Sequence, residues 1–316
     1  MKILVTPTSF KLSKGGPALE LLLSFSKDLV FNPQEKPLLE DELIPLLAGC
    51  EGCIAGLDFI TRKVIEKAPE LKVISRYGVG VDRVDLEAAR EKGVVVCNTP
   101  GVNANGVADL VFALLLAIAR RVPLLDRKTK EGQWLRSTGF ELCGKTIGIL
   151  GLGAVGKAVA KRAAGFSMKI MAYDPFLNKE YTLANGIIAA SFDEVIKEAD
   201  FISLHLPLMD ETRNIINEDT MKSMKQGAVI INTARGGLID ESAAYNLLKS
   251  GHLGGLGLDA FETEPPGSSP LFTLDNVVVT PHTGAHTAEA MAAMADMSVR
   301  NLIDVLSGKS CPNVVQ

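Results

Sequence analysis

The sequence predicts an α/β protein with two doubly wound parallel-sheet domains, Rossmann-like or flavodoxin-like, with a cleft between them. Three observations predict this fold class. The chain of 316 residues is longer than one ordinary core needs and suits two domains. Short apolar runs alternate with helix-like segments from end to end, which is typical of parallel sheets covered by helices on both faces. A glycine-rich turn at 151–156 joins one of these runs directly to a helix-like segment.

The predicted strands are short apolar runs bounded by turn residues, and the predicted helices carry apolar residues three or four positions apart. The strands lie at 2–5, 73–75, 94–96, 146–150, 169–173, 200–204, 228–231, 254–258 and 277–280. The helices lie near 105–121, 154–165, 218–225, 240–250 and 287–308. The helix from Val107 to Arg121 is apolar nearly all round, so it needs cover on every side. Burial within the monomer and burial in a subunit interface both remain open for it.

Two turn-rich breaks predict where the chain crosses between the domains. One break is at 98–101 and the other at 280–284, just before the last helix. We therefore expect residues 1–98 and 286–316 to form one discontinuous domain, and residues 99–285 to form the other.

Composition argues against several classes of partner. The net charge is −4, with 33 basic and 37 acidic residues mixed along the chain, so we expect no nucleic acid. The longest apolar run, 110–119, is too short to cross a bilayer, so we expect no membrane partner. No signal peptide opens the sequence, and five scattered cysteines fit a reducing compartment, so we expect a cytoplasmic protein.

The glycine-rich turn predicts a dinucleotide site in the domain of residues 99–285. Gly151 permits a tight turn, Gly153 lets the main chain approach a pyrophosphate, and Gly156 lets helix and strand pack closely. The helix that starts at Ala154 and Val155 offers free N–H groups and the positive end of its dipole to the phosphates. That domain is then the NAD-binding Rossmann domain, and the discontinuous one binds substrate.

An acidic residue after the next strand indicates which nucleotide binds. Asp174 follows the strand 169–173, where a carboxylate can bond both ribose hydroxyls. The same carboxylate would repel a 2′-phosphate, and no arginine follows immediately. NAD is therefore favoured over NADP as the cofactor.

Three polar residues at strand ends suggest the chemistry. Reduction of a 2-keto acid needs a cation that grips the carboxylate and an acid that protonates the alkoxide. Arg235 follows one strand, Glu264 lies in a loop after another, and His282 follows a third. Alone, these residues could be a solvated cation, a residue flanking a proline turn and a capping histidine. Together, downstream of a nucleotide fold, they predict an NAD-dependent oxidoreductase that moves a hydride to or from C2 of a small 2-hydroxy acid.

These residues and several longer motifs resemble the D-2-hydroxyacid dehydrogenase family, particularly its D-3-phosphoglycerate dehydrogenases. The likeness runs from about residue 50 to about residue 310. Besides the glycine-rich turn, the matching stretches are 76–82, 98–103, 205–207, 232–237, 258–265 and 280–282.

The resemblance implies roles for the three catalytic candidates. It implies that Arg235 binds the substrate carboxylate and carbonyl oxygen, that His282 is the acid and base, and that Glu264 is its partner. It also implies that main-chain N–H groups hold the substrate carboxylate, in a loop made by Gly78, Val79 and Gly80.

Further roles come from the resemblance alone. Asp259 would contact the nicotinamide carboxamide, His205 and Thr233 would line the cofactor cleft, and Asn103 would lie on the substrate side. The resemblance also implies a homodimer through the region of about 105–140 and a cleft that closes on binding.

The best interpretation of the substrate is 3-phosphoglycerate, oxidised to 3-phosphohydroxypyruvate in serine biosynthesis. A phosphate needs a cation, and Arg76, Lys11 and Arg136 are candidates. The sequence ends soon after its last predicted helix, so we expect a short form without a C-terminal regulatory domain. The alternative is a hydroxypyruvate, glyoxylate or other 2-keto acid reductase.

Rival classes are weaker. Cys50 and Cys53 form a C-x-x-C without a second pair, so we expect incidental thiols and no metal. Enzymes of a similar fold that oxidise formate need no proton shuttle, and they have glutamine at the position of Glu264. Glu264 therefore argues against formate oxidation. A non-enzymatic, NAD-responsive corepressor would carry partner-binding extensions, which this sequence does not show.

Overall fold

The computed structural model describes residues 1–12 and 16–315, without the side chains of residues 11 and 12. The chain forms two compact units, and one of them is discontinuous in sequence. These units are Met1–Asn103 with His286–Gln316, and Ala104–Ala285.

The first division lies at the start of helix α6 (Ala104–Ala119), five residues after the expected division at 98/99. Residues 99–103 stay with the first unit, and Thr99, the first of them, is hydrogen-bonded within it. The Thr99 N–H donates to the carbonyl of Gly78 at 3.0 Å.

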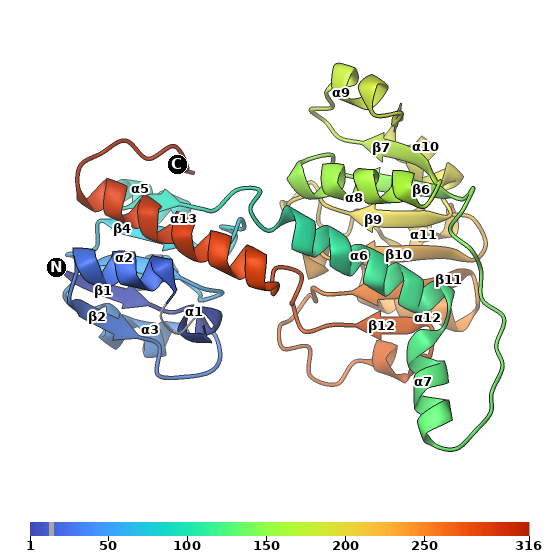
Figure 1. The fold of residues 1–316 in the computed structure, drawn as a ribbon, viewed down its shortest axis with the longest axis horizontal. Coiled ribbons are helices and arrows are strands. Elements are labelled where there is room, and N and C mark those ends of the chain that lie inside the picture. The colour runs from blue at the N-terminus through green and yellow to red at the C-terminus, as the bar shows by residue number, and fades with distance from the viewer. Residues whose placement is uncertain (13–15, 316) are drawn as a thin grey trace. The chain divides into compact units, whose positions relative to one another are not determined.

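Within the described residues of the first unit, five strands form a parallel sheet in the order β2-β1-β3-β4-β5. The long helix α13 returns from the end of the chain and packs against α2, β3 and β4 (Figure 1). Gly52 permits this packing, since a Cβ there would lie 3.1 Å from a methyl carbon of Leu302. The elements are β1 (Lys2–Val5), α1 (Thr8–Leu12), α2 (Pro17–Phe25), β2 (Asp28–Phe31), α3 (Glu40–Leu47), β3 (Cys50–Ala55), α4 (Arg62–Glu66), β4 (Val73–Arg76), α5 (Leu86–Glu91), β5 (Val95–Cys97) and α13 (Ala288–Leu306).

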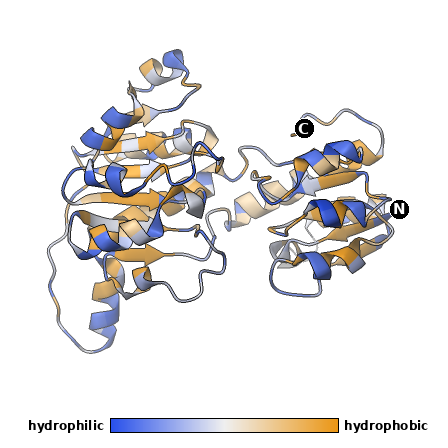
Figure 2. Ribbon diagram, turned by 180° about the vertical axis from the view of Figure 1, so that it is seen from behind, coloured by the Kyte–Doolittle hydropathy of each residue, from blue (hydrophilic) through white to orange (hydrophobic). Residues whose placement is uncertain are grey.

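In the second unit, all of which is described, seven strands form a parallel sheet in the order β12-β11-β10-β9-β6-β7-β8. Helices α6 and α8 lie side by side on one face, and α10 and α12 pack on strands from the other (Figure 1). The strands are largely apolar, while most helices other than α6 mix apolar and polar residues (Figure 2). The strand order reverses between β6 and β9, which is where α/β proteins of this kind bind ligands.

The remaining elements of the second unit follow α6 in chain order. They are α7 (Val122–Lys130), β6 (Thr146–Leu150), α8 (Ala154–Gly165), β7 (Lys169–Tyr173), α9 (Lys179–Ala184), β8 (Ile188–Ala189), α10 (Phe192–Glu198), β9 (Phe201–Leu204), α11 (Glu218–Lys222), β10 (Ala228–Asn232), η1 (Gly236–Leu238), α12 (Glu241–Lys249), β11 (Leu253–Leu258), η2 (Pro270–Thr273) and β12 (Val277–Val279).

The predicted fold class is confirmed, but the predicted strands omit β2, β3 and β8. Strand β3 is almost entirely buried, yet Glu51 and Gly52 interrupt its apolar pattern. The apolar helix ends at Ala119 rather than at Arg121, because Arg121 has a left-handed φ of 53°. Most of α6 is buried inside the second unit, which supplies much of the cover that its sequence requires. Among the described residues, no helix combines the length and the apolar character that a membrane span needs.

Candidate active site

The glycine-rich turn is packed against protein at two positions and open at the third. A Cβ on Gly151 would lie 2.7 Å from the carbonyl carbon of His205, and one on Gly156 would lie 2.1 Å from the oxygen of Gly151. A Cβ on Gly153 would meet no atom within 4 Å. Gly153 is the N-cap of α8 and has no side chain that could accept a hydrogen bond. The first N–H groups of the helix, from Ala154 and Val155, therefore have no capping acceptor and can bind a ligand. This cradle fits a pyrophosphate.

Asp174 is hydrogen-bonded to the glycine-rich turn. It follows β7, and its Oδ2 accepts the N–H of Leu152 at 2.7 Å while its Oδ1 accepts the N–H of Phe176 at 2.8 Å. The carboxylate therefore holds the turn in place and lies beside it. A contact with a ribose stays a prediction.

Two further candidates lie after neighbouring strands. Nε2 of His205 lies 2.8 Å from the hydroxyl of Ser203, and burial lowers the pKa of His205 to about 3. This ring is therefore neutral at physiological pH and cannot be a proton shuttle there. The hydroxyl oxygen of Thr233 is buried and has no hydrogen-bond partner among the described residues. Such an orphaned polar atom next to the dinucleotide fold is what a bound cofactor would satisfy.

His282 and Glu264 form a direct pair. Nδ1 of His282 lies 2.8 Å from Oε1 and 3.0 Å from Oε2 of Glu264. The side chains are 28% and 15% exposed, so the pair is shielded but the imidazole is still accessible. A carboxylate can only accept, so Nδ1 carries the hydrogen and Nε2 is left for substrate.

The turn that carries His282 is held by Asp259. His282 has a left-handed φ of 53°, which is unusual for a residue with a side chain. Asp259 is 1% exposed and accepts the N–H of Thr283 at 2.7 Å and the N–H of Gly284 at 2.8 Å. It also accepts the hydroxyl of Thr280 at 2.7 Å. Asp259 thus supports the turn on both sides of the imidazole, and a contact with nicotinamide stays a prediction.

Arg235 lies in a tight turn after β10. Asn232, fully buried at the end of that strand, donates from Nδ2 to the carbonyl of Arg235 at 2.7 Å and accepts the N–H of Ala234 at 3.0 Å. Nη1 of Arg235 donates to the carbonyl of Ala234 at 2.8 Å. The second unit therefore carries Arg235, Glu264 and His282 after β10, β11 and β12, at the carboxyl ends of three adjacent strands.

In the first unit, the loop of Gly78, Val79 and Gly80 follows β4. Its three carbonyls accept hydrogen bonds from the N–H of Thr99, from Nδ2 of Asn98 and from Nε of Arg76, respectively. None of its three N–H groups has a hydrogen-bond partner among the described residues. Adjacent unpaired N–H groups of this kind form an anion site.

The other substrate candidates differ in their surroundings. Arg76 is 3% exposed and donates to the carbonyls of Ala55 and Gly80. It therefore stabilises the loop of residues 78–80 from the buried side. Oδ1 of Asn103 is buried without a partner in the described part of the chain. Arg136 is exposed in a segment without helix or strand, and the side chain of Lys11 lies outside the described residues.

Sequence reasoning missed the residues that support the site. Asn98, Asn232 and Glu241 hold main-chain groups beside the candidates. Asn232 directly follows a predicted strand, Asn98 lies two residues after one, and both precede turns, which is a usable signal. Glu241 begins a helix, and nothing in its local sequence indicates a distant partner.

The five cysteines are free thiols, and Cys50 and Cys53 are buried in β3. Burial raises the pKa of both thiols, which makes them unreactive. Among the described residues no group of three or more His, Cys, Asp or Glu side chains could hold a metal ion.

The comparison with protein families decides what this arrangement belongs to. The model of the D-isomer specific 2-hydroxyacid dehydrogenase NAD-binding domain matches residues 112–284, which include the glycine-rich turn and all three strand-end candidates. The chain belongs to that family. The expected resemblance is confirmed, and so are NAD as cofactor and membership among NAD-dependent oxidoreductases that act on CH–OH groups.

Several relatives of this dehydrogenase have names that indicate different substrates. It is 48% identical over 259 residues to D-3-phosphoglycerate dehydrogenase of Methanocaldococcus jannaschii, a match that covers 81% of this chain but only 49% of that protein. It is 44% identical over 267 residues to glyoxylate reductase of Thermococcus litoralis, covering 82% and 81%. It is 46% identical over 259 residues to hydroxypyruvate reductase of Thermotoga maritima, covering 80% and 84%.

A crystal structure of a Thermus thermophilus protein shares 40% identity with this dehydrogenase. The match has a TM-score of 0.89 and covers 100% of both chains.

Proposed function

We propose that this dehydrogenase reduces a small 2-keto acid at C2, with His282 as the acid and base and Arg235 as the carboxylate-binding cation. The observation that carries the proposal is the His282–Glu264 pair, 2.8 Å apart at the carboxyl end of the NAD-binding sheet. NADH, when bound, supplies the hydride.

The proton steps follow from the geometry of the pair. Because Nδ1 is bonded to Glu264, Nε2 delivers the proton to the C2 alkoxide in reduction and takes it back in oxidation. The carboxylate of Glu264 stabilises the imidazolium and fixes its tautomer. The guanidinium of Arg235 would polarise the keto oxygen and donate hydrogen bonds to the adjacent carboxylate.

The cofactor would lie on Gly151, Gly153 and Gly156, with its phosphates at the N–H groups of Ala154 and Val155. Asp174 would receive the ribose hydroxyls, and Thr233, His205 and Asp259 would face the nicotinamide half. The unpaired N–H groups of residues 78–80 support their assignment to the substrate carboxylate. The unit of Met1–Asn103 with His286–Gln316 would then be the substrate-binding domain, with Asn103 on its substrate side, and Ala104–Ala285 would be the NAD-binding domain.

We propose 3-phosphohydroxypyruvate as the keto acid, which would place the enzyme in serine biosynthesis. The Methanocaldococcus relative supports this choice. The relatives named glyoxylate reductase and hydroxypyruvate reductase support a smaller keto acid as the second candidate. Arg76 is engaged with main-chain carbonyls, so a phosphate would need another cation.

The test is NADH consumption with phosphohydroxypyruvate, hydroxypyruvate, glyoxylate, pyruvate and 2-oxoglutarate. We expect the highest kcat/KM with phosphohydroxypyruvate. A preference for glyoxylate or hydroxypyruvate would replace the substrate and keep the mechanism. NADH binding without turnover of any of these acids would favour a corepressor-like binding protein.

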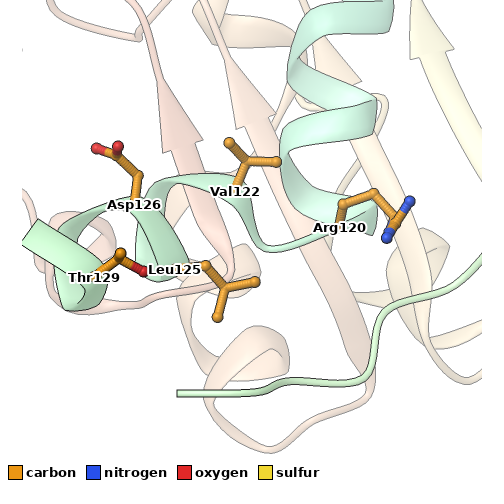
Figure 3. Close-up of a pocket in the computed structure, with 5 residues that line it drawn as sticks. All are labelled: Arg120, Val122, Leu125, Asp126 and Thr129. Carbon is orange, nitrogen blue, oxygen red and sulfur yellow. The ribbon is translucent and has the colours of Figure 1, made fainter. Parts of the chain in front are cut away.

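A homodimer through 105–140 is part of the proposal. Trp134 is 82% exposed and Val122 is 53% exposed, so this region offers large apolar side chains to a second copy of the chain. A shallow hollow of about 550 Å³ lies where α6 meets α7, and Val122 is one of the residues that line it (Figure 3). It is lined by Arg120, Val122, Leu125, Asp126 and Thr129. Light scattering should give twice the mass of one chain.

The proposed location is the cytoplasm, and the five free thiols fit a reducing compartment of that kind.

A further inference from the structure

We propose that Glu241 is a positioning residue for the Glu264–His282 pair. The inference rests on the proposed acid–base role of that pair and adds a residue outside it. Glu241 is the first residue of α12, and its Oε1 accepts the N–H of Glu262 at 2.8 Å. Glu262 is two residues before Glu264, so this bond ties the start of the helix to the loop that carries the partner of the imidazole.

A second contact holds the same peptide. A Cβ on Gly236 would lie 1.8 Å from the carbonyl carbon of Phe261 and 2.1 Å from the nitrogen of Glu262. The main chain at Gly236 therefore lies directly against the Phe261–Glu262 peptide. The segment from Gly236 to Glu241 thus contacts this peptide at both of its ends, by packing at Gly236 and by a hydrogen bond at Glu241.

The preceding peptide, Ala260–Phe261, in turn orients the carboxylate of Glu264. The N–H of Phe261 donates to Oε1 of Glu264 at 3.2 Å, and the same oxygen lies 2.8 Å from Nδ1 of His282. Because the two peptides share Phe261, a shift of the Phe261–Glu262 peptide would also move this N–H donor, and with it the carboxylate oxygen that faces the imidazole. Glu241 acts on His282 through these two peptides and through the carboxylate of Glu264.

Helix capping does not explain Glu241. The N-cap of α12 is Asp240, whose Oδ1 accepts the N–H of Ala243 at 2.9 Å. Burial raises the pKa of Glu241, and the nearby negative charge of Glu262 raises it further. A half-buried acid beside another acid is electrostatically costly, and the hydrogen bond from the Glu262 N–H offsets part of that cost.

The test compares Glu241→Ala with Glu241→Gln, because the glutamine oxygen can still accept the N–H of Glu262. Glu218→Ala is the matched control, since Glu218 also starts a short helix after a side-chain N-cap, away from this loop. We expect Glu241→Ala to lower kcat on the best keto acid about 10- to 100-fold, the usual effect of a displacement of about 1 Å. Glu241→Gln should stay within about threefold of the wild type, and Glu218→Ala should match it.

Two readouts separate positioning from a general loss of structure. The Kd for NADH and the Tm of Glu241→Ala should change no more than those of Glu218→Ala. In the chain without cofactor, nitrogen NMR of His282 should show the hydrogen-bonded Nδ1–H in the wild type and in Glu241→Gln, and its weakening in Glu241→Ala.

Three other outcomes would contradict either the positioning role of Glu241 or the proposed function. If Glu241→Ala keeps full kcat while His282→Ala loses it, the inference fails and the proposed function stands. If His282→Ala keeps full kcat, the proposed function fails, and the NMR signal still reports whether Glu241 orients the pair. If Glu241→Ala loses NADH affinity and thermal stability in step with kcat, Glu241 is a structural residue only.

Discussion

Asp259 holds the turn in which His282 adopts a left-handed main-chain conformation. Its two carboxylate oxygens accept the N–H groups of Thr283 and Gly284, which directly follow the histidine. Glu264 then bonds the ring itself at 2.8 Å. The buried Asp259 fixes the main chain next to His282, and the partly buried Glu264 orients its imidazole through Nδ1, which leaves Nε2 for the substrate.

Removal of the imidazole should remove the proton shuttle and little else. We expect His282→Ala to lower kcat roughly 10²–10⁴-fold, the usual contribution of a positioned acid or base. The Kd for NADH, measured by fluorescence, should change little because the glycine-rich turn is untouched. The exposed His286 provides the control, since His286→Ala changes a nearby histidine outside the pair. A His282→Ala enzyme with full kcat would contradict the mechanism.

A single-atom change at Asp259 should loosen the turn. In Asp259→Asn the amide NH₂ would face an N–H or hydroxyl donor, which leaves one buried donor unsatisfied. We expect a loss of about 1–3 kcal/mol in the free energy of unfolding, measured with urea, and a lower kcat. Unchanged stability would mean that these hydrogen bonds do not determine the conformation of the turn.

Asp174 should strengthen NADH binding in two ways, by contact with the ribose and by its hydrogen bond to the glycine-rich turn. Asp174→Ala removes the proposed ribose contact and also the acceptor for the N–H of Leu152, so the glycine-rich turn is less fixed. We expect weaker NADH binding and a smaller preference for NADH over NADPH, because the charge that repels a 2′-phosphate is gone. Titrations of both nucleotides test this. An unchanged preference would place ribose recognition elsewhere.

A methyl group at Gly236 should be among the most damaging small substitutions in the second unit. In Gly236→Ala the new carbon would overlap the Phe261–Glu262 peptide, which is main chain and cannot rotate away. We expect a loss of about 3 kcal/mol in the free energy of unfolding. Gly153→Ala is the contrasting variant, since its Cβ meets open space, and it should weaken NADH binding with little loss of stability.

The parts of the site that could be predicted from sequence are those that depend on local order along the chain. Arg235 and His282 each lie three residues after an apolar strand, and parallel strands bring their carboxyl ends to one edge of a sheet. The supporting contacts depend instead on tertiary packing. Nothing local to Glu241 indicates that it reaches Glu262, and nothing local to Arg76 indicates that its guanidinium is bonded to the carbonyls of Ala55 and Gly80.

The same limit applies to the fold. The alternation of strands and helices was enough to predict two parallel sheets. Strand β3 was missed because Glu51 and Gly52 break its apolar run, although Gly52 is there to admit α13 from the far end of the chain. Gly52 allows the contact with α13, and the same glycine interrupts the apolar pattern from which strand β3 could have been predicted.

Acid should destabilise the protein partly through His205. Burial lowers the pKa of this ring from 6.5 to about 3, while the unfolded chain keeps the ordinary value. Below pH 6.5 the unfolded state therefore binds a proton that the folded state does not, so this contribution to stability is present above pH 6.5 and is lost as the pH falls toward 3.

His205→Gln removes the titrating ring and retains a polar side chain next to Ser203. Between about pH 7.5 and about pH 5.5, the wild type should lose about 1 kcal/mol more free energy of unfolding than His205→Gln does. Urea denaturation at the two pH values measures the difference, and His286→Gln, at an exposed position, controls for the loss of one histidine. If His205→Gln shows the same pH dependence as the wild type, the ring of His205 must be protonated as readily in the folded protein as in the unfolded chain.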